Sequence, residues 1–168
     1  GHILKSCGLD PTVINGGIML NYPQSAGLGN VLTGNGSFCV IEADESDGSI
    51  ALYSPAVALV NSITLDHKPV EELRPLFADF VARASVGAVL NADCPETAAL
   101  KDKNQNVMTY SIRGADADLK AENLTPTQTG ISFMLDGEKI NLLLPGHHNV
   151  SNALAALSAA EMIGIPRS

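Results

Sequence analysis

The feature that most constrains the fold is a regular alternation of short apolar runs with helix-length amphipathic segments in the middle of the chain. In order, the segments are an apolar run at 56–60, helical spacing at 70–84, an apolar run at 88–90, a short helix at 95–101 and an apolar run at 107–110. Asp93 is interpreted as the N-cap of the short helix. Strand, helix, strand, helix, strand is the order of parallel βαβ units with right-handed crossovers. We therefore predict an α/β fold with a mostly parallel central sheet flanked by helices.

The pattern changes in the last third of the chain. Residues 119–124, 131–135 and 140–144 are predicted to form short strands, and Asp136-Gly137 between the last two is a strong hairpin signal. We interpret these strands as a small antiparallel annex to the parallel sheet. An Ala-rich helix over residues 150–163 follows. At 168 residues the chain has the length of one domain, which we take as residues 1–168.

The first part of the chain contains less regular structure. Residues 2–8 are typical of the last turns of a helix that ends at a glycine. Residues 12–14 are predicted to form a short strand, residues 20–36 mostly a loop, and residues 38–41 a short buried strand. A helix this short is not stable alone, so we expect the chain to begin inside a longer structure.

An acidic loop follows the predicted strand at 38–41. Residues 42–48 read Glu-Ala-Asp-Glu-Ser-Asp-Gly, and open α/β sheets bind their ligands at the carboxyl ends of the strands. Crowded carboxylates repel one another unless a cation compensates them, and Mg²⁺ is the usual cation where phosphates are also bound. A solvated acidic turn is the simpler alternative for such a loop.

Two further polar groups follow predicted elements in the same way. Asp66-His67 comes after the apolar run at 56–60, and the Ala-rich helix is preceded or opened by Gly146, His148, Asn149 and Asn152. If the first two loops belong to adjacent parallel strands, they converge on one crevice. Taken singly, an Asn at a helix start is more commonly a cap, and a lone His is more commonly a structural residue.

Composition excludes several functional classes. The net charge is -8 with only 10 Lys and Arg and no basic cluster, which argues against nucleic-acid partners. No apolar run approaches the roughly 20 residues of a membrane span, so we expect no membrane insertion. Cys7, Cys39 and Cys94 are scattered, and we interpret them as packing residues of a protein in a reducing, cytoplasmic setting.

The order of the motifs along the chain and the spacing between them are also informative. Along the chain they are Ile14-Asn15-Gly16-Gly17, the acidic loop at 42–48, Asp66-His67, and Pro145-Gly146-x-His148-Asn149-x-x-Asn152 followed by Ala153-Leu154-Ala155-Ala156. Together they resemble the central domain of the Mur ligases, over essentially the whole chain. The first motif matches the family's Ile-Gly-Gly element with one residue inserted. The acidic motif is closest to the members that add L-alanine or a murein tripeptide to UDP-N-acetylmuramate.

The resemblance implies an ATP-dependent amide ligase of peptidoglycan precursor synthesis. Members of the family use ATP to convert a substrate carboxylate into an acyl phosphate, which an amino group then attacks. Mg²⁺ bridges the phosphates and offsets charge during the transfer. The implied cofactors are therefore ATP and Mg²⁺, and the implied partners are a UDP-N-acetylmuramate-type substrate and an amino acid or peptide.

The resemblance also implies roles for individual residues. Glu42 matches the ligand of the ATP-linked Mg²⁺. His67 matches the ligand of a second Mg²⁺ beside the acyl phosphate, with Asp66 orienting it, and these two form the implied catalytic pair. The implied adenine-side contacts are His148, Asn149 and Asn152, whose Asn amides supply a donor and an acceptor. Support roles fall to Asp44, Glu45, Ser46 and Asp47.

Two large parts of the family pattern are missing from the sequence. The Gly-Lys-Thr turn of the family's P-loop does not occur in the 168 residues, and no segment matches the third domain that closes over ATP. We therefore expect an excised central domain that is a monomer or weak dimer and is catalytically inactive alone. We also expect it to bind Mg-ATP poorly, because the P-loop amides form the main phosphate cradle.

Smaller departures leave the function of the parent protein open. Asn61-Ser62-Ile63 stands where the family reads Thr-Asn-Ile, Lys68 follows Asp66-His67, and the helix after it contains Arg74 and Arg83 but no Lys to complete a second metal site. The alanine-adding members also lack that Lys.

Three alternatives to the alanine-adding ligase therefore remain. They are a tripeptide-recycling ligase, a divergent paralogue that acts as a nucleotide-binding module, and a Mg²⁺-dependent phosphohydrolase built on Glu42, Asp44 and Asp47. The phosphohydrolase ranks last, because no Asp stands directly at a strand end with a second Asp two residues later.

Overall fold

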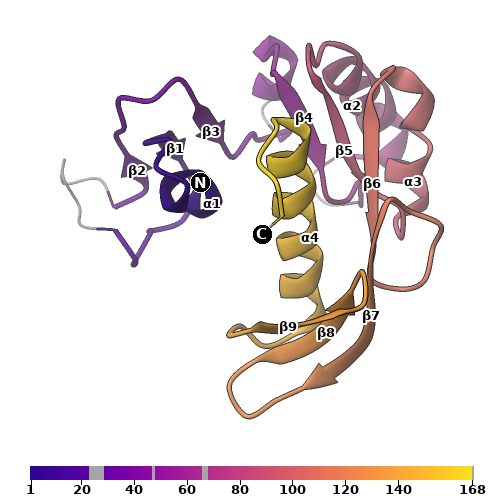
Figure 1. Ribbon diagram of the computed structural model, residues 1–168. Helices are drawn as coiled ribbons and strands as arrows, with labels where there is room; N and C mark the ends of the chain where they lie inside the picture. Colours follow the sequence, from indigo (N-terminus) through magenta and orange to yellow (C-terminus); the bar gives the residue numbers. More distant parts are fainter. Residues whose placement is uncertain (23–28, 47, 66–67, 168) are drawn as a thin grey trace. The chain divides into compact units, whose positions relative to one another are not determined.

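The structure is a computed structural model of the chain (Figure 1). It describes residues 1–22, 29–46, 48–65 and 68–167. The chain divides into two compact units, residues 1–47 and residues 48–168, and each is described by itself.

The first unit is a small three-stranded sheet with one short helix. Its elements are α1 (His2–Ser6), β1 (Thr12–Ile14), β2 (Val31–Leu32) and β3 (Cys39–Ile41). The strand order is β2-β1-β3, with β1 antiparallel to β2 and parallel to β3. Leu4, Val13 and Leu32 form its buried core. The predicted strand at 12–14 and the helix end near Gly8 are confirmed.

The prediction that the strand at 38–41 is buried is wrong. Ile41 is 42% exposed, and its register partner Ile14 is 41% exposed. Successive side chains of a strand point to opposite faces. Val13 points to the face where Gly1, at the start of α1, lies against its methyl groups. Ile14 and Ile41 point to the other face, which no helix among the described residues of this unit covers.

The second unit holds a six-stranded sheet and three α-helices. In chain order its elements are a 3-10 turn (Ser49–Leu52), β4 (Val57–Val60), α2 (Val70–Ala82), β5 (Gly87–Asn91), α3 (Pro95–Ala98), a second 3-10 turn (Lys101–Lys103), β6 (Val107–Ser111), β7 (Leu119–Pro126), β8 (Ile131–Leu135), β9 (Glu138–Leu142) and α4 (His147–Met162). The spatial order of the strands is the same as their sequence order.

The parallel half of this sheet follows the predicted βαβ alternation. β4 pairs in parallel with β5, and β5 pairs in parallel with β6. The central strand β5 has Ala88, Val89 and Leu90 fully buried. Because β5 is buried on both faces, its sequence is a continuous apolar run and does not alternate between apolar and polar residues.

The antiparallel half is continuous with the parallel half. β7 pairs in parallel with β6 and antiparallel with β8, and β8 pairs antiparallel with β9. Asp136 and Gly137, the predicted hairpin dipeptide, have φ values of 50° and 83°, as a type I′ turn requires. The predicted annex is thus confirmed, and β7 is the strand that joins it to the parallel strands.

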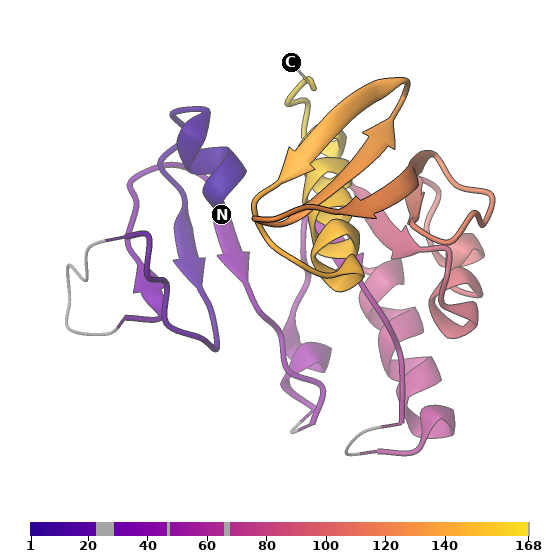
Figure 2. The ribbon, with the colours of Figure 1, turned by 90° about the horizontal axis from the view of Figure 1, so that it is seen from below.

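Helices cover both faces of the six-stranded sheet (Figures 1 and 2). α4 lies across one face and α2 with α3 lies on the other, so Val89 of β5 packs with the α4 side chains Val150 and Leu154 in the main core cluster. Small side chains let α4 approach closely, as its Ala-rich sequence predicts. Within the described residues, no helix is long and apolar enough to cross a membrane.

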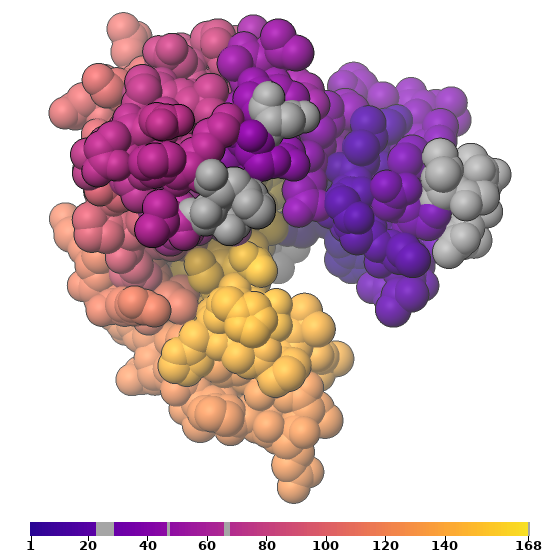
Figure 3. All heavy atoms as spheres, turned by 180° about the vertical axis from the view of Figure 1, so that it is seen from behind, coloured from indigo at the N-terminus to yellow at the C-terminus, as the bar shows by residue number. Residues whose placement is uncertain are grey.

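One side of α4 remains at the surface of the second unit. In the space-filling view, yellow atoms of α4 lie beside the orange atoms of the segment that holds β7, β8 and β9 (Figure 3). Along the helix, Asn152 and Ala156 are exposed whereas Leu154 and Ala155 are buried. The beginning of α4 is therefore accessible to a ligand.

The cysteine prediction is wrong for two of the three residues. Cys7 and Cys39 are exposed, and Cys94 is half-buried. Cys39 lies on the same uncovered face of β3 as Ile41. It is therefore exposed for the same reason as Ile41.

Candidate functional site

The acidic loop of the first unit begins at the carboxyl end of two parallel strands. Glu42 extends the β1–β3 ladder, because its backbone N–H donates to the Ile14 carbonyl at 3.0 Å. The backbone N–H of Gly16, just after β1, donates to Glu42 Oε2 at 2.6 Å. A Cβ on Gly16 would lie 3.0 Å from the same oxygen. The glycine thus lets the backbone come close enough to orient the carboxylate.

This geometry suits a hard cation at Glu42. The side chain is exposed, and a backbone N–H aligns it. Mg²⁺ commonly keeps several waters and is held by one or two carboxylates together with substrate phosphates, so one oriented carboxylate is a sufficient protein contribution. Among the described residues, no group of three or more His, Cys, Asp or Glu side chains is arranged to hold a metal ion.

The rest of the acidic loop is described as far as residue 46. Asp44 Oδ1 accepts a hydrogen bond from the Ser46 N–H at 2.7 Å, which closes a local Asx turn. Asp47, Asp66 and His67 lie outside the described residues. The implied catalytic pair and its second metal therefore stay predictions, as does the convergence of the two loops on one crevice. β3 and β4 belong to different sheets, so the premise that the two loops follow adjacent strands of one sheet is wrong.

In the second unit, polar side chains at the carboxyl ends of β4, β5 and β6 form a connected network. Tyr110 Oη donates to Asn61 Oδ1 at 2.5 Å. Asn61 Nδ2 donates to Asn152 Oδ1 on α4 at 3.1 Å, and Asn91 Nδ2 donates to the Asn61 carbonyl at 2.9 Å. We call Asn61, Asn91, Tyr110 and Asn152 the crest network.

Sequence reasoning missed the central member of the crest network. Asn61 was noted only as a departure from a family motif, and Tyr110 only as the end of a strand. The available signal was that Asn61 and Asn91 each follow an apolar parallel strand, which places both at the same edge of the sheet.

Tyr110 is the most deeply buried polar group of this network. Its side chain is fully buried. Burial raises its pKa to about 12, against the opposing effect of a hydrogen bond with Ser151. Tyr110 therefore keeps its hydroxyl proton at physiological pH and remains a donor to Asn61.

Gly146, the N-cap residue of α4, has a backbone conformation that favours glycine. Gly146 has φ 94° and ψ 143°, and a Cβ there would lie 2.8 Å from the Cε1 atom of His148. Asn149 Nδ2 donates to the Pro145 carbonyl at 2.7 Å. Of the three predicted adenine-side residues, the structure thus brings Asn152 into the crest network, whereas Asn149 bonds locally and His148 lies against Gly146.

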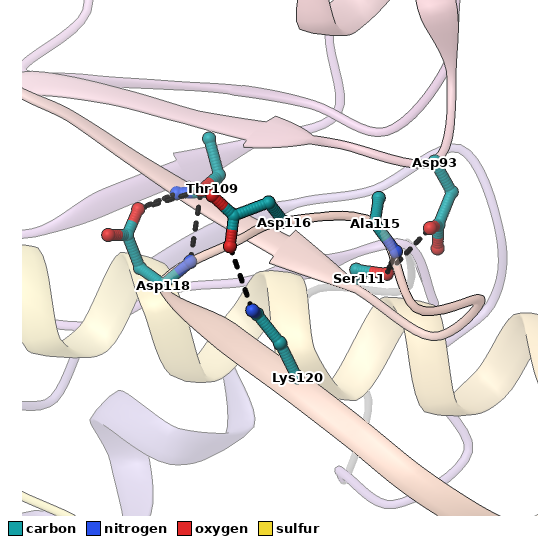
Figure 4. A network of polar contacts seen from close by, with 7 residues as sticks. All are labelled: Asp93, Thr109, Ser111, Ala115, Asp116, Asp118 and Lys120. Carbon is teal, nitrogen blue, oxygen red and sulfur yellow. Dashed lines mark hydrogen bonds and ion pairs between the residues drawn. The ribbon is translucent and has the colours of Figure 1, made fainter.

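Asp93 braces the loop after β6 instead of capping α3, so the N-cap prediction is wrong (Figure 4). Its Oδ1 accepts from Ser111 Oγ at 2.6 Å and its Oδ2 from the Ile112 N–H at 2.7 Å. The N-cap of α3 is Cys94. The Ser111 hydroxyl is buried and uses Asp93 as its acceptor. Ser111 Oγ in turn accepts from the Ala115 N–H at 3.0 Å.

A second carboxylate closes the same loop at its other end (Figure 4). Asp118 Oδ2 accepts from both the N–H and the hydroxyl of Thr109, each at 2.7 Å. Burial alone would raise the Asp118 pKa, but these two hydrogen bonds lower it below its ordinary value. The loop between β6 and β7 is therefore fastened at both ends, which fixes the crest network from the β6 side.

Comparison with known proteins decides the family. The model of the Mur ligase middle domain matches residues 2–160. The chain belongs to the Mur ligase family. This confirms the resemblance read from the motifs, and the mostly parallel α/β sheet predicted for such a domain is the one described above.

Two curated relatives of this Mur ligase domain carry the same name. A UDP-N-acetylmuramate--L-alanine ligase of Novosphingobium aromaticivorans is 36% identical over 97% of this chain and 37% of its own length. The same-named ligase of Xylella fastidiosa strain 9a5c is 39% identical over 98% of this chain and 36% of its own length. The chain therefore spans little more than a third of the relatives that it matches.

Solved structures agree on the fold. The UDP-N-acetylmuramate:L-alanyl-gamma-D-glutamyl-meso-diaminopimelate ligase from Neisseria meningitides superimposes with a TM-score of 0.74 at 24% identity. The match covers 96% of this chain and 56% of that one. At this identity the match is evidence for the Mur ligase fold alone.

Proposed function

We propose that this chain is the central, ATP-binding domain of a cytoplasmic ligase that joins L-alanine to UDP-N-acetylmuramate in peptidoglycan precursor synthesis. The observation that carries the proposal is the similarity of 36–39% over nearly the whole chain to ligases of that name. In the proposed reaction, ATP converts the substrate carboxylate into an acyl phosphate, and the amino group of L-alanine displaces the phosphate.

Glu42 is the residue we assign to the ATP-linked Mg²⁺. Its carboxylate is exposed and is oriented by the Gly16 N–H, and carboxylate oxygens suit this hard cation. When bound, the metal offsets the negative charge that moves with the phosphoryl group. Asp66 and His67 are proposed, on the family motif alone, to serve the second Mg²⁺ and the acyl phosphate.

The beginning of α4 is the part we assign to the adenine base. Asn61 donates to Asn152 Oδ1, so Asn152 offers its Nδ2 as a donor. Asn149 uses Nδ2 on the Pro145 carbonyl, so its Oδ1 is the atom it offers as an acceptor. A donor and an acceptor on one helix suit the edge of a purine, whose ring nitrogens accept and whose amino group donates. His148 is proposed as a neighbouring contact.

A tripeptide-recycling ligase is the second candidate. The acidic motif at residues 42–48 is common to both kinds of enzyme in the resemblance described above. The two differ in the amino group that attacks the acyl phosphate, so the acceptor distinguishes them.

ADP release by the intact ligase tests the proposal. The protein is given Mg-ATP and UDP-N-acetylmuramate, with L-alanine in one reaction and the murein tripeptide in a parallel one. Turnover with L-alanine alone is expected. Turnover with the tripeptide alone supports the second candidate. If a folded protein releases no ADP in either reaction, the result supports a divergent paralogue that binds nucleotide without catalysing this reaction.

A further inference from the structure

The orientation of the Asn152 side-chain amide depends on its hydrogen bond with Asn61. Its Oδ1 faces Asn61 Nδ2 at 3.1 Å, and both side chains are exposed at the surface of the second unit. An exposed Asn without such a partner rotates between two amide orientations that differ by exchanging a donor with an acceptor. Whatever fixes Asn61 therefore decides which atom Asn152 presents to a ligand.

Asn61 is fixed by the buried tyrosine. Tyr110 Oη lies 2.5 Å from Asn61 Oδ1, and Tyr110 is fully buried on β6. The same Asn61 residue accepts through its backbone carbonyl from Asn91 Nδ2 at 2.9 Å, and Asn91 Oδ1 accepts from the Asp93 N–H at 2.9 Å. The Tyr110 oxygen also has a hydrogen bond with Ser151, and its own proton goes to Asn61 Oδ1. In this arrangement Asn61 therefore turns its Nδ2 to Asn152.

We propose that Tyr110 and Asn61 are positioning residues that hold the Asn152 amide with its donor outward, and that they thereby set the affinity for the adenine base of ATP. The inference rests on the proposed function, because it assumes that Asn152 faces the base. Neither residue needs to touch the nucleotide. Their effect passes through the two successive hydrogen bonds.

Asn61→Asp in the intact ligase is the sharpest test of these two successive hydrogen bonds, which we call the relay. An aspartate keeps the size of the side chain and still accepts from Tyr110, but it can no longer donate, so Asn152 must turn its Nδ2 inward. The KM for ATP is expected to rise by about tenfold, the usual equivalent of one hydrogen bond lost to a mismatched pair. The kcat and the KM for UDP-N-acetylmuramate are expected to stay unchanged.

Two controls separate orientation from charge and from folding. Asn141→Asp makes the same chemical change on the exposed side of β9 and is expected to leave the KM for ATP unchanged. Repeating the comparison at high salt screens any repulsion between the new carboxylate and the triphosphate, and the tenfold ratio is expected to persist.

Tyr110→Phe tests the first step without adding charge. Removing the hydroxyl lets Asn61 adopt both amide orientations, and if they are equally populated the competent fraction halves. The KM for ATP then rises by about twofold, again with kcat unchanged. Tyr53→Phe, which removes a hydroxyl from the residue after the first 3-10 turn, is the matched control and is expected to have no effect.

The outcomes distinguish this inference from the proposed function. Turnover by the wild-type ligase, with both variants matching their controls in KM for ATP, would overturn the relay and leave the proposed function intact. A fall in kcat at constant KM would also overturn it, since that pattern indicates general structural damage. Absence of both turnover and ATP binding in the folded wild-type protein would overturn the proposed function and the relay together.

Discussion

The crest network and the acidic loop hold their polar side chains in different ways. In the crest network, Asn61 just after β4 bonds the side chains of Tyr110 and Asn152 through its own amide, and its backbone carbonyl accepts from the Asn91 side chain. In the acidic loop, backbone N–H groups of Gly16 and Ser46 orient carboxylates that lie at the surface.

The difference separates stability from function. Breaking a network of partly buried side chains leaves donors or acceptors without partners, which costs folding free energy. An exposed carboxylate oriented by a backbone donor contributes little to folding, but it is ready for a cation. We therefore expect substitutions in the acidic loop to lower turnover, and substitutions in and around the crest network to lower stability and, where they act on Asn152, the affinity for ATP, with kcat unchanged.

The largest effect is expected for Glu42→Gln in the intact ligase. Losing the carboxylate charge that we assign to the ATP-linked Mg²⁺ should lower kcat by roughly a hundredfold or more, since such metal contacts are worth several kcal/mol in the transition state. The free energy of unfolding should change by less than about 0.5 kcal/mol, as for other surface substitutions. Steady-state kinetics and urea unfolding measure the two quantities.

Glu138→Gln on β9 is the control for that experiment, because it makes the same change at an exposed site of the second unit. Unchanged turnover in Glu42→Gln, or a large loss of stability, would break the comparison between the two regions.

Gly146→Ala tests how rigidly the start of α4 is held. Its φ of 94° disfavours any L side chain, and the new Cβ would lie 2.8 Å from the His148 ring. We expect a loss of roughly 1–3 kcal/mol in unfolding free energy, measured by urea unfolding. Gly164→Ala is the matched control: φ is 85° but nothing lies within 4 Å of its Cβ position. Equal losses in both would assign the whole effect to backbone strain and none to His148.

Asp93→Asn tests the brace beside the crest network. The carboxylate accepts from Ser111 Oγ and the Ile112 N–H through different oxygens, and an amide can replace only one acceptor. We expect a loss of about 1–2 kcal/mol in unfolding free energy, with kcat of the folded ligase unchanged. Asp102→Asn, at an exposed site on the second 3-10 turn, should be neutral. A fall in kcat without a loss of stability would reverse the roles assigned to the two regions.

The smallest effect is expected for Arg74→Ala, which removes an ion pair that belongs to neither region. Arg74 Nε and Nη2 donate to the two carboxylate oxygens of Glu96 at 2.7 and 2.6 Å. The hydrogen bond from Arg74 lowers the Glu96 pKa below its ordinary 4.5, but Arg74 is exposed and Glu96 is only half-buried, and contact with solvent weakens such pairs.

The pH dependence follows from the direction of that shift. A carboxyl group with a lowered folded-state pKa stabilises the protein above its unfolded-state pKa, and this contribution is lost as the pH falls through the folded-state value. The Tm of Arg74→Ala should therefore lie slightly below that of the wild type at pH 7 and match it once Glu96 is protonated. Lys103→Ala serves as the control. A Tm difference that persists in acid would mean that Arg74 acts through packing.

Local patterns were sufficient to predict most of the elements. The apolar run at 88–90 is β5, the helical spacing at 70–84 is α2, and Asp136-Gly137 forms the predicted turn. These features depend on side-chain periodicity or on one dipeptide, so neighbouring residues are enough to specify them.

Predictions failed where a distant partner decided the outcome. Asp93 has the position of an N-cap, yet it bonds Ser111, 18 residues later. The apolar run at 38–41 has the composition of a buried strand, yet Ile41 is exposed because this unit covers only one face of its sheet. Neither result can be read from a short window, because each depends on what packs against the segment.

The sequence by itself determined the Mur ligase family, the order of strands and helices, and the motif residues Glu42, His148, Asn149 and Asn152. Only the tertiary structure joined Asn61 to Tyr110, 49 residues away, and to Asn152, 91 residues away. The physical reason is that strand register and helix packing bring these amides and the hydroxyl within hydrogen-bond distance. Hydrogen bonds are short-ranged and directional, so their pairing is decided when the sheet and α4 assemble.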